Sequence, residues 1–289
     1  MFNLETLVSG SENKLSHRCA LRIYAVYETL KKAEKKAVDF MLDNAELVAQ
    51  SPVTEIAKLA DCSEATYIRL AKKLGYSGYP EMKSDLLRKA DEHIHTMYGA
   101  LDSNDDEISV ATKVFGTSVQ SLNDTLGIID PQKYKMALEI MQNARRFVFL
   151  GAGDAYIVAY SAYMKFFRMG FPASCSSDLD LQLIDATKMD ERDVMIVISH
   201  SGETKSVYQV VQCAKKKNAK IITISNYPRS TIGKHSDVVL QTAAFVPDML
   251  GEIITKRIPE LCMIESLYIN MLIRSDMKEA DEYLLINKL

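Results

Sequence analysis

The stretch Val194-Met195-Ile196-Val197-Ile198-Ser199-His200-Ser201-Gly202-Glu203-Thr204 decides the fold of the second half of this chain. Its first five residues are an apolar, β-branched run of strand length, and the pattern after Thr204 is amphipathic. A hydroxyl-rich loop therefore joins a buried strand to a helix. The free N–H groups and positive dipole end of such a helix favour an anion, and Gly202 lets the backbone approach it closely. The loop predicts a phosphate site; a Ser/Thr-rich helix cap without a ligand is the alternative.

Four further apolar runs predict a parallel sheet around this strand. They lie at residues 147–150, 172–175, 221–224 and 238–240, and helix-length segments separate them. Short buried strands that alternate with helices are typical of an α/β fold. Ligands gather beyond the carboxyl ends of such strands, so the loop at residues 151–155, directly after the first run, is predicted to face the same cleft.

No cofactor or metal is expected. A dinucleotide fingerprint in the loop Gly151-Ala152-Gly153 needs a third glycine where this chain has Tyr156, so the glycines are interpreted as a tight turn that leaves space for a ligand. His93 and His95 lie in a polar segment without a nearby cysteine and make a poor metal site. The five cysteines are scattered and odd in number, which is typical of reduced thiols in a cytoplasmic protein.

The first half has a helical pattern from residue 17 to about residue 90. Ser51-Pro52 ends one helix, Thr54 is expected to cap a short helix over 55–59, and Ser63 to cap another over 64–74, which Gly75 ends. Two short helices joined by three or four residues are typical of a helix-turn-helix, whose second helix can enter a DNA major groove. An ordinary helical hairpin with solvated charges is the alternative.

On the second of these helices the spacing places Ala65, Ile68 and Leu70 toward the core, with Leu74 extending the stripe. The remaining side chains are then available to DNA, where arginine and threonine can read base edges and lysines attract phosphates. The predicted DNA-binding residues are Ser63, Glu64, Thr66, Tyr67, Arg69, Lys72 and Lys73.

Length and charge fit two domains. The chain has 289 residues and a net charge of −3, yet residues 1–90 hold fourteen Lys/Arg against twelve Asp/Glu, so the front is mildly basic and the rest acidic. We expect a helix-turn-helix domain over 1–90, a linker over 91–106 and a ligand-binding domain over 107–289. Helical patterns resume at 107–126 and at Pro131, with Asp130 as its cap. The helical pattern at 253–275 is expected to supply a core face, and a subunit contact is the alternative. The apolar runs are too short to span a bilayer, and residues 1–10 lack the features of a signal peptide, so no membrane partner is expected.

Both halves carry strings that resemble a known family. Residues 199–204 and the glycines at 151 and 153 resemble the loops of a SIS, or sugar isomerase, domain, a flavodoxin-like fold that binds phosphosugars. Residues 63–76, SEATYIRLAKKLGY, and the following GYPEMK at 78–83 resemble the helix-turn-helix of RpiR-type transcriptional regulators. The order of the two, over about residues 16–275, is similar to that family. The resemblance implies an all-α helix-turn-helix domain followed by an α/β flavodoxin-like SIS domain with a parallel sheet.

The resemblance also implies a function: a DNA-binding regulator of carbohydrate metabolism that a phosphosugar modulates. Its partners would be operator DNA, a phosphorylated sugar and further copies of the chain in a homodimer or homotetramer. Ser199, Ser201 and Thr204 would hold the phosphate, and the 151–155 turn would contact the sugar. Family members often carry serine where this chain has Ala155, so a different sugar or weaker binding follows. The predicted ligand-binding residues are Gly151, Gly153, Asp154, Ala155, Ser199, His200, Ser201, Gly202, Glu203 and Thr204.

Two other functions stay open from the sequence. A phosphosugar isomerase needs a base against the sugar carbons, for which His200, Glu203, Glu252 and Glu260 are candidates. A DNA-reading module is superfluous in a metabolic enzyme, so we expect no catalysis. An adaptor with a silent SIS domain is the third interpretation, which Ala155 keeps open.

Overall fold

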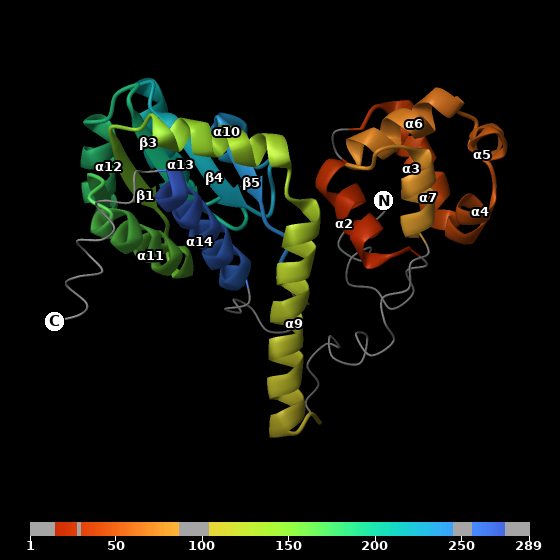
Figure 1. The fold of residues 1–289 in the computed structure, drawn as a ribbon, viewed down its shortest axis with the longest axis horizontal. Coiled ribbons are helices and arrows are strands. Elements are labelled where there is room, and N and C mark those ends of the chain that lie inside the picture. The colour runs from red at the N-terminus through yellow and green to blue at the C-terminus, as the bar shows by residue number, and fades with distance from the viewer. Residues whose placement is uncertain (1–14, 28–29, 87–103, 245–255, 275–289) are drawn as a thin grey trace. The chain divides into compact units, whose positions relative to one another are not determined.

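The computed structural model describes residues 15–27, 30–86, 104–244 and 256–274 (Figure 1). The chain divides into two units, and the break falls inside helix α9, between Gln120 and Ser121. In the ranges described, no helix is long and apolar enough to cross a membrane. The greater part of the predicted linker at 91–106 lies outside the described residues, as do His93, His95 and Glu252.

The first unit is helical, as predicted. Its core is built from fully buried side chains that include Ile23, Met41, Ile56 and Tyr67. The helix before Ser51-Pro52 does end there, with a break at Asn44. The described helices are α2 His17–Val26, α3 Lys32–Asp43, α4 Ala45–Gln50, α5 Val53–Leu59, α6 Glu64–Lys73 and α7 Tyr79–Leu86.

Helices α5 and α6 form the predicted helix-turn-helix. Ser63 caps α6, since its Oγ accepts from the amide of Thr66 at 3.2 Å, and Gly75 ends the helix with φ +79°. The expected cap at Thr54 is wrong: α5 begins two residues earlier, directly after Pro52, whose fixed φ suits a helix start. Thr54 therefore lies inside the helix.

The second unit holds a parallel sheet of five strands in the order β2-β1-β3-β4-β5. All five predicted runs are strands, and each bound lies within about a residue of the prediction. The order reverses between β1 and β3, which is the place where open α/β sheets bind ligands. The strands are β1 Arg146–Leu150, β2 Ala173–Cys175, β3 Asp193–Ile198, β4 Lys220–Ser225 and β5 Val238–Gln241.

Helices cover both faces of this sheet (Figure 1). Phe147 and Phe149 point to the face covered by α10, α11 and α14, whereas Val148 and Leu150 point to the face covered by α12 and α13. Asp130 caps α10 as predicted, and α14 packs its apolar side into the core. The elements outside the sheet are α9 Glu107–Ile128, α10 Pro131–Gln142, α11 Asp154–Arg168, α12 Leu179–Thr187, α13 Lys205–Lys216, the short helix η2 Gly233–His235 and α14 Arg257–Arg274.

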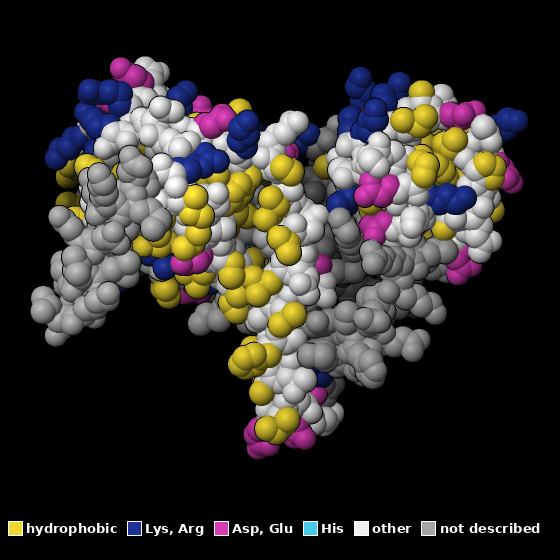
Figure 2. Space-filling view, viewed as in Figure 1, with side chains coloured by type: hydrophobic (Ala, Val, Ile, Leu, Met, Phe, Trp, Pro, Cys, Tyr) yellow, Lys and Arg dark blue, Asp and Glu magenta, His cyan; other side chains and the backbone are white. Residues whose placement is uncertain are grey.

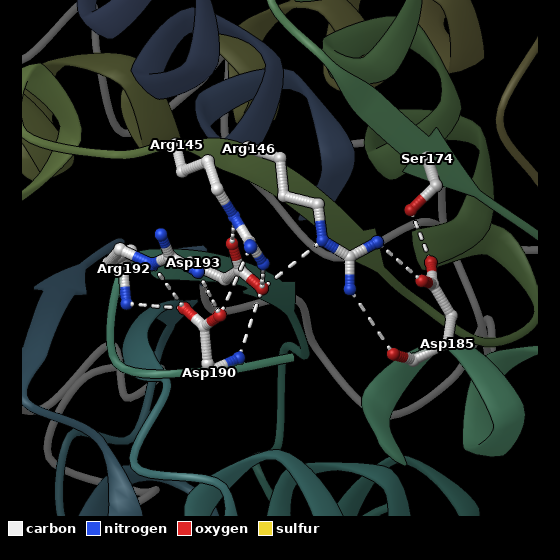
Figure 3. A network of polar contacts seen from close by, with 7 residues as sticks. All are labelled: Arg145, Arg146, Ser174, Asp185, Asp190, Arg192 and Asp193. Atoms are coloured by element: carbon white, nitrogen blue, oxygen red, sulfur yellow. Dashed lines mark hydrogen bonds and ion pairs between the residues drawn. The ribbon is translucent and has the colours of Figure 1, made fainter. Parts of the chain in front are cut away.

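A network of charged side chains ties the amino ends of β1 and β3 together (Figure 3). Asp193 is fully buried and receives the Arg145 guanidinium at 2.8 and 2.7 Å and the Arg146 Nε at 3.2 Å. Arg146 also pairs with Asp185, which accepts from Ser174. The buried carboxylate is thus fully hydrogen-bonded at the amino ends of the strands, opposite the loops that follow β1 and β3.

Candidate ligand site and nucleic-acid interface

The loop after β3 leads directly into α13, with Thr204 as the helix N-cap. The side chain of Thr204 makes no capping bond, and the first amides of a helix have no partner within it. Among the described residues, the buried Ser199 Oγ and His200 Nδ1 have no hydrogen-bond partner. Buried polar atoms are normally paired, so a ligand with acceptor oxygens would satisfy this corner.

Residues at the end of β4 and in the loop after it donate hydrogen bonds to the loop between β3 and α13. The Ser225 hydroxyl and the Asn226 amide both donate to the His200 carbonyl, at 3.0 and 3.1 Å, and the Ile232 amide donates to the Gly202 carbonyl at 3.0 Å. These bonds cross from one strand loop to the next. The backbone of residues 200–202 is therefore held in place by the neighbouring loop.

Glu203 also takes part in the hydrogen bonds between these two loops. Its carboxylate accepts from the amide of Thr231 at 2.7 Å and from the Thr231 hydroxyl at 2.6 Å, and these bonds lower the pKa of the carboxyl. The prediction that Glu203 contacts the ligand is therefore not supported by this geometry, because both of its oxygens are engaged by the loop. Spacing along the sequence carries no signal for a partner 28 residues away.

Gly202 is required by packing. It has φ +65°, and a Cβ at this position would lie 1.9 Å from the Oγ and 2.4 Å from the Cβ of Ser230. Its role is to let the two loops touch, and it offers the ligand only its backbone.

The His200 ring lies edge-on to Tyr227, with centroids 5.9 Å apart. Burial, together with the charges of Lys256 and Arg257, lowers the pKa of His200 to about 4, so the ring is neutral near pH 7. The two cations lie at the start of α14, where Arg257 pairs with Glu260 at 2.8 Å. Sequence reasoning missed both, because no motif links them to a loop more than fifty residues earlier.

The loop after β1 lies beside the loop after β3, because the two strands pair with Leu150 opposite Val197. Gly151 packs against the first turn of α11, where a Cβ would meet the Ala155 carbonyl oxygen at 2.5 Å. Gly153 has φ +56° and open space around it, and Asp154 begins α11. The structure thus brings together the two predicted loops.

Ala155 departs from its predicted role. Its methyl group is buried in the hydrophobic core beneath α11, so it does not reach a ligand. Its amide and that of Tyr156 donate to the carbonyls of Ala152 and Gly153. These amides are therefore already engaged within the turn.

The face of α6 that is available to DNA differs from the prediction. Thr66 is only 3% exposed and Tyr67 is fully buried, with the ring edge-on to Tyr79 and the hydroxyl donating to Ala37. Thr66 and Tyr67 are therefore wrong as DNA contacts. The prediction turned the helix to the wrong face. A tyrosine ring can be buried in the core when its hydroxyl donates to a backbone carbonyl, as that of Tyr67 does. The buried stripe of α6 is Thr66, Tyr67, Leu70, Ala71 and, at the C-cap, Leu74.

Two further side chains of this helix are engaged. The Ser63 hydroxyl caps the helix and bonds the Thr66 hydroxyl, and Lys73 pairs with Glu34 at 2.6 Å. Figure 2 shows Lys and Arg side chains gathered near α6 on the first unit. The exposed face of α6 consists of Glu64, Ala65, Ile68, Arg69, Lys72 and Lys73.

Both halves of the chain match known protein families. The model of the helix-turn-helix domain of the rpiR family matches residues 18–93, and the SIS domain model matches residues 140–270. An uncharacterized HTH-type transcriptional regulator of Caldanaerobacter subterraneus subsp. tengcongensis is 29% identical over 237 residues, which are 82% of this chain and 84% of that protein.

Two solved structures share the fold. The NanR protein of Vibrio vulnificus, complexed with ManNAc-6P, has a TM-score of 0.58 at 23% identity and covers 93% of this chain and 96% of its own. The sugar isomerase domain of an RpiR transcription factor from Sphaerobacter thermophilus has a TM-score of 0.55 at 16% identity, over 62% of this chain and 99% of that domain. The chain therefore carries a helix-turn-helix domain of the rpiR family followed by a SIS domain, and it is similar over most of its length to HTH-type transcriptional regulators.

Proposed function

We propose that this chain is a cytoplasmic DNA-binding regulator of carbohydrate metabolism, and that a phosphorylated sugar bound at the carboxyl edge of its sheet is the effector. The observation that carries the proposal is the corner between β3 and α13. There the buried Ser199 Oγ and His200 Nδ1 have no partner among the described residues, and no side-chain cap from Thr204 occupies the first amides of α13. Lys256 adds a positive charge that favours a phosphate dianion, whereas Arg257 is paired with Glu260.

The site residues divide into contacts and supports. Ser199, His200, Ser201 and Thr204, with the amides of the α13 N-terminus, are the proposed phosphate contacts. The open turn at Gly153 is the proposed place for the sugar. Residues that shape these loops without touching the ligand are Gly151, Ala155, Gly202 and Glu203.

The phosphate site is tested with Thr204→Val, which removes one hydroxyl and keeps the size of the side chain. Wild type should gain thermal stability with a sugar phosphate, because a ligand that binds only the folded state stabilises it. The screen covers hexose, pentose and amino-sugar phosphates and begins with N-acetylmannosamine 6-phosphate, which the NanR structure contains. The variant should bind the ligand so identified about tenfold more weakly, the loss of one hydrogen bond to a charged group.

Thr187→Val is the matched control, since Thr187 lies on α12 with its hydroxyl bonded to the Ile184 carbonyl. Titration calorimetry measures each affinity. Equal affinity of wild type and Thr204→Val would remove Thr204 from the site, and no stabilisation by any sugar phosphate would overturn the proposed effector.

We propose no catalytic role for the candidate bases. The Glu203 oxygens accept from Thr231, and the Glu260 carboxylate is fully buried with both oxygens bonded to Arg257. Burial lowers the pKa of His200 to about 4, well below the value near the working pH that suits a general base. NMR of a sugar phosphate incubated with the protein should show no aldose–ketose conversion; turnover would support an isomerase instead.

DNA binding is proposed for the exposed face of α6, with Arg69 toward base edges and Lys72 toward phosphates. Arg69→Ala should weaken operator binding about tenfold or more, measured by fluorescence anisotropy at moderate salt. Lys135→Ala, an exposed residue on α10, is the control for loss of one charge. Unchanged binding by Arg69→Ala would show that α6 does not read the operator. Because such modules read two half-sites, we propose a homodimer or homotetramer.

A further inference from the structure

We infer that Ile68 determines operator specificity by contacting the 5-methyl group of a thymine in the major groove. This inference rests on the proposed binding of DNA through α6. It concerns a side chain that the sequence pattern assigns to the core and that the structure places outside it. Ile68 is 41% exposed, and it lies outside the buried stripe that contains Tyr67, Leu70 and Ala71.

The register of α6 places apolar side chains along the middle of its exposed face. Ala65, Ile68 and Lys72 follow one another at spacings of three and four, so they form one line along the helix. Glu64 and Arg69 flank this line. The side chains in the middle of a reading helix reach deepest into a groove, and the first two of the three are apolar.

The major groove offers one apolar feature to such a line. Guanine, adenine and cytosine present only hydrogen-bond donors and acceptors there, whereas thymine adds its 5-methyl group. Ile68 placed against a polar base edge would leave that edge without a partner after water is excluded. Placed against thymine, the branched side chain and the methyl group shield each other from water.

The matched comparison in the same unit is Leu59, an exposed apolar residue that is 53% exposed at the end of α5. It lies on the neighbouring helix and not on the exposed face of α6. If exposed apolar surface in this unit served only general association, Leu59 and Ile68 would behave alike. The inference predicts that only Ile68 responds to the methyl group of a base.

The experiment begins with the full-length protein and a random DNA library, selected both without ligand and with a mixture of sugar phosphates, to obtain a binding sequence. Each thymine of that sequence is then replaced by deoxyuridine, which lacks only the methyl group. Wild type should lose about fourfold in affinity at one thymine per half-site, the equivalent of one buried methyl group. Ile68→Ala should bind the thymine sequence more weakly and show no further loss at that position.

Leu59→Ala should keep the full sensitivity to deoxyuridine, and equal melting temperatures would confirm that the variants are folded. A wild type insensitive to every deoxyuridine, or an Ile68→Ala variant with undiminished sensitivity at every position, would overturn the inference while DNA binding stands. If no sequence is enriched in the selection, the proposed DNA binding itself fails, and this inference fails with it.

Discussion

Two glycines with positive φ lie in the two loops of the proposed ligand site, and they are there for different reasons. At Gly153 the backbone is left-handed, but a Cβ would meet nothing within 4 Å. At Gly202 the backbone is also left-handed, and a Cβ would overlap Ser230. The first position restricts only the backbone, whereas the second also restricts the distance between two loops.

This difference gives a matched pair of substitutions. Gly153→Ala should lower the free energy of unfolding by about 1–2 kcal/mol, the strain of an alanine at φ +56° and ψ −133°. Gly202→Ala should lower it by about 2–4 kcal/mol, because Ser230 or the loop must move, and it should also abolish stabilisation by the sugar phosphate. Urea denaturation with and without ligand measures both. Similar losses in the two variants would show that the loops are not tightly packed against each other.

At the scale of elements, the ion pairs in Figure 3 join the first residues of β1 and β3 and so fix the register of the two central strands. Asp193 is the centre of this network and has no access to solvent. Arg192, by contrast, is 62% exposed where it pairs with Asp190. A buried charge that loses its partner is costly, whereas an exposed ion pair contributes little.

Asp193→Asn should therefore lower the free energy of unfolding by about 2–4 kcal/mol, since two arginines lose their carboxylate at once. Arg192→Ala should lower it by less than about 1 kcal/mol. Chemical denaturation of each variant in the same buffer decides the matter. Equal effects would mean that water reaches Asp193 in solution.

The strands were predictable from the sequence because strands buried on both faces are continuous apolar runs. The buried face of α6 was not predictable, because Thr66 and Tyr67 have polar groups whereas Ala65 and Ile68 are apolar. Burying the large tyrosine ring removes more apolar surface from water than burying either of the two apolar side chains. The two loops of the site were predictable from their glycines and hydroxyls. The bond from Glu203 to Thr231 was not, since only the fold brings them together.

At the scale of the whole molecule, the proposed function requires the ligand site and the DNA face to influence each other through one equilibrium. Thermodynamic linkage makes such coupling reciprocal. If the sugar phosphate changes operator affinity by a given factor, operator DNA must change the affinity for the sugar phosphate by the same factor, typically about 5- to 150-fold.

Anisotropy titrations of labelled operator, with and without ligand, give the first factor, and calorimetric titrations of ligand, with and without operator, give the second. Thr204→Val should bind operator as wild type does and should respond only at higher ligand concentration. An operator affinity that is the same with and without bound sugar phosphate would contradict regulation by this ligand, even if the ligand site is correct.

The hydrogen bonds that Thr231 donates to Glu203 hold the loop at residues 199–204 in shape within the folded protein. Because another part of the fold already holds the loop in shape, its conformational entropy is lost during folding and not at the encounter with the sugar. The proposed sugar phosphate would then bind to a preorganised loop, and its association would be limited mainly by diffusion, with little rearrangement of the loop. A small molecule present at low concentration is sensed quickly by such a preorganised receptor, and its departure is equally free of any slow loop opening.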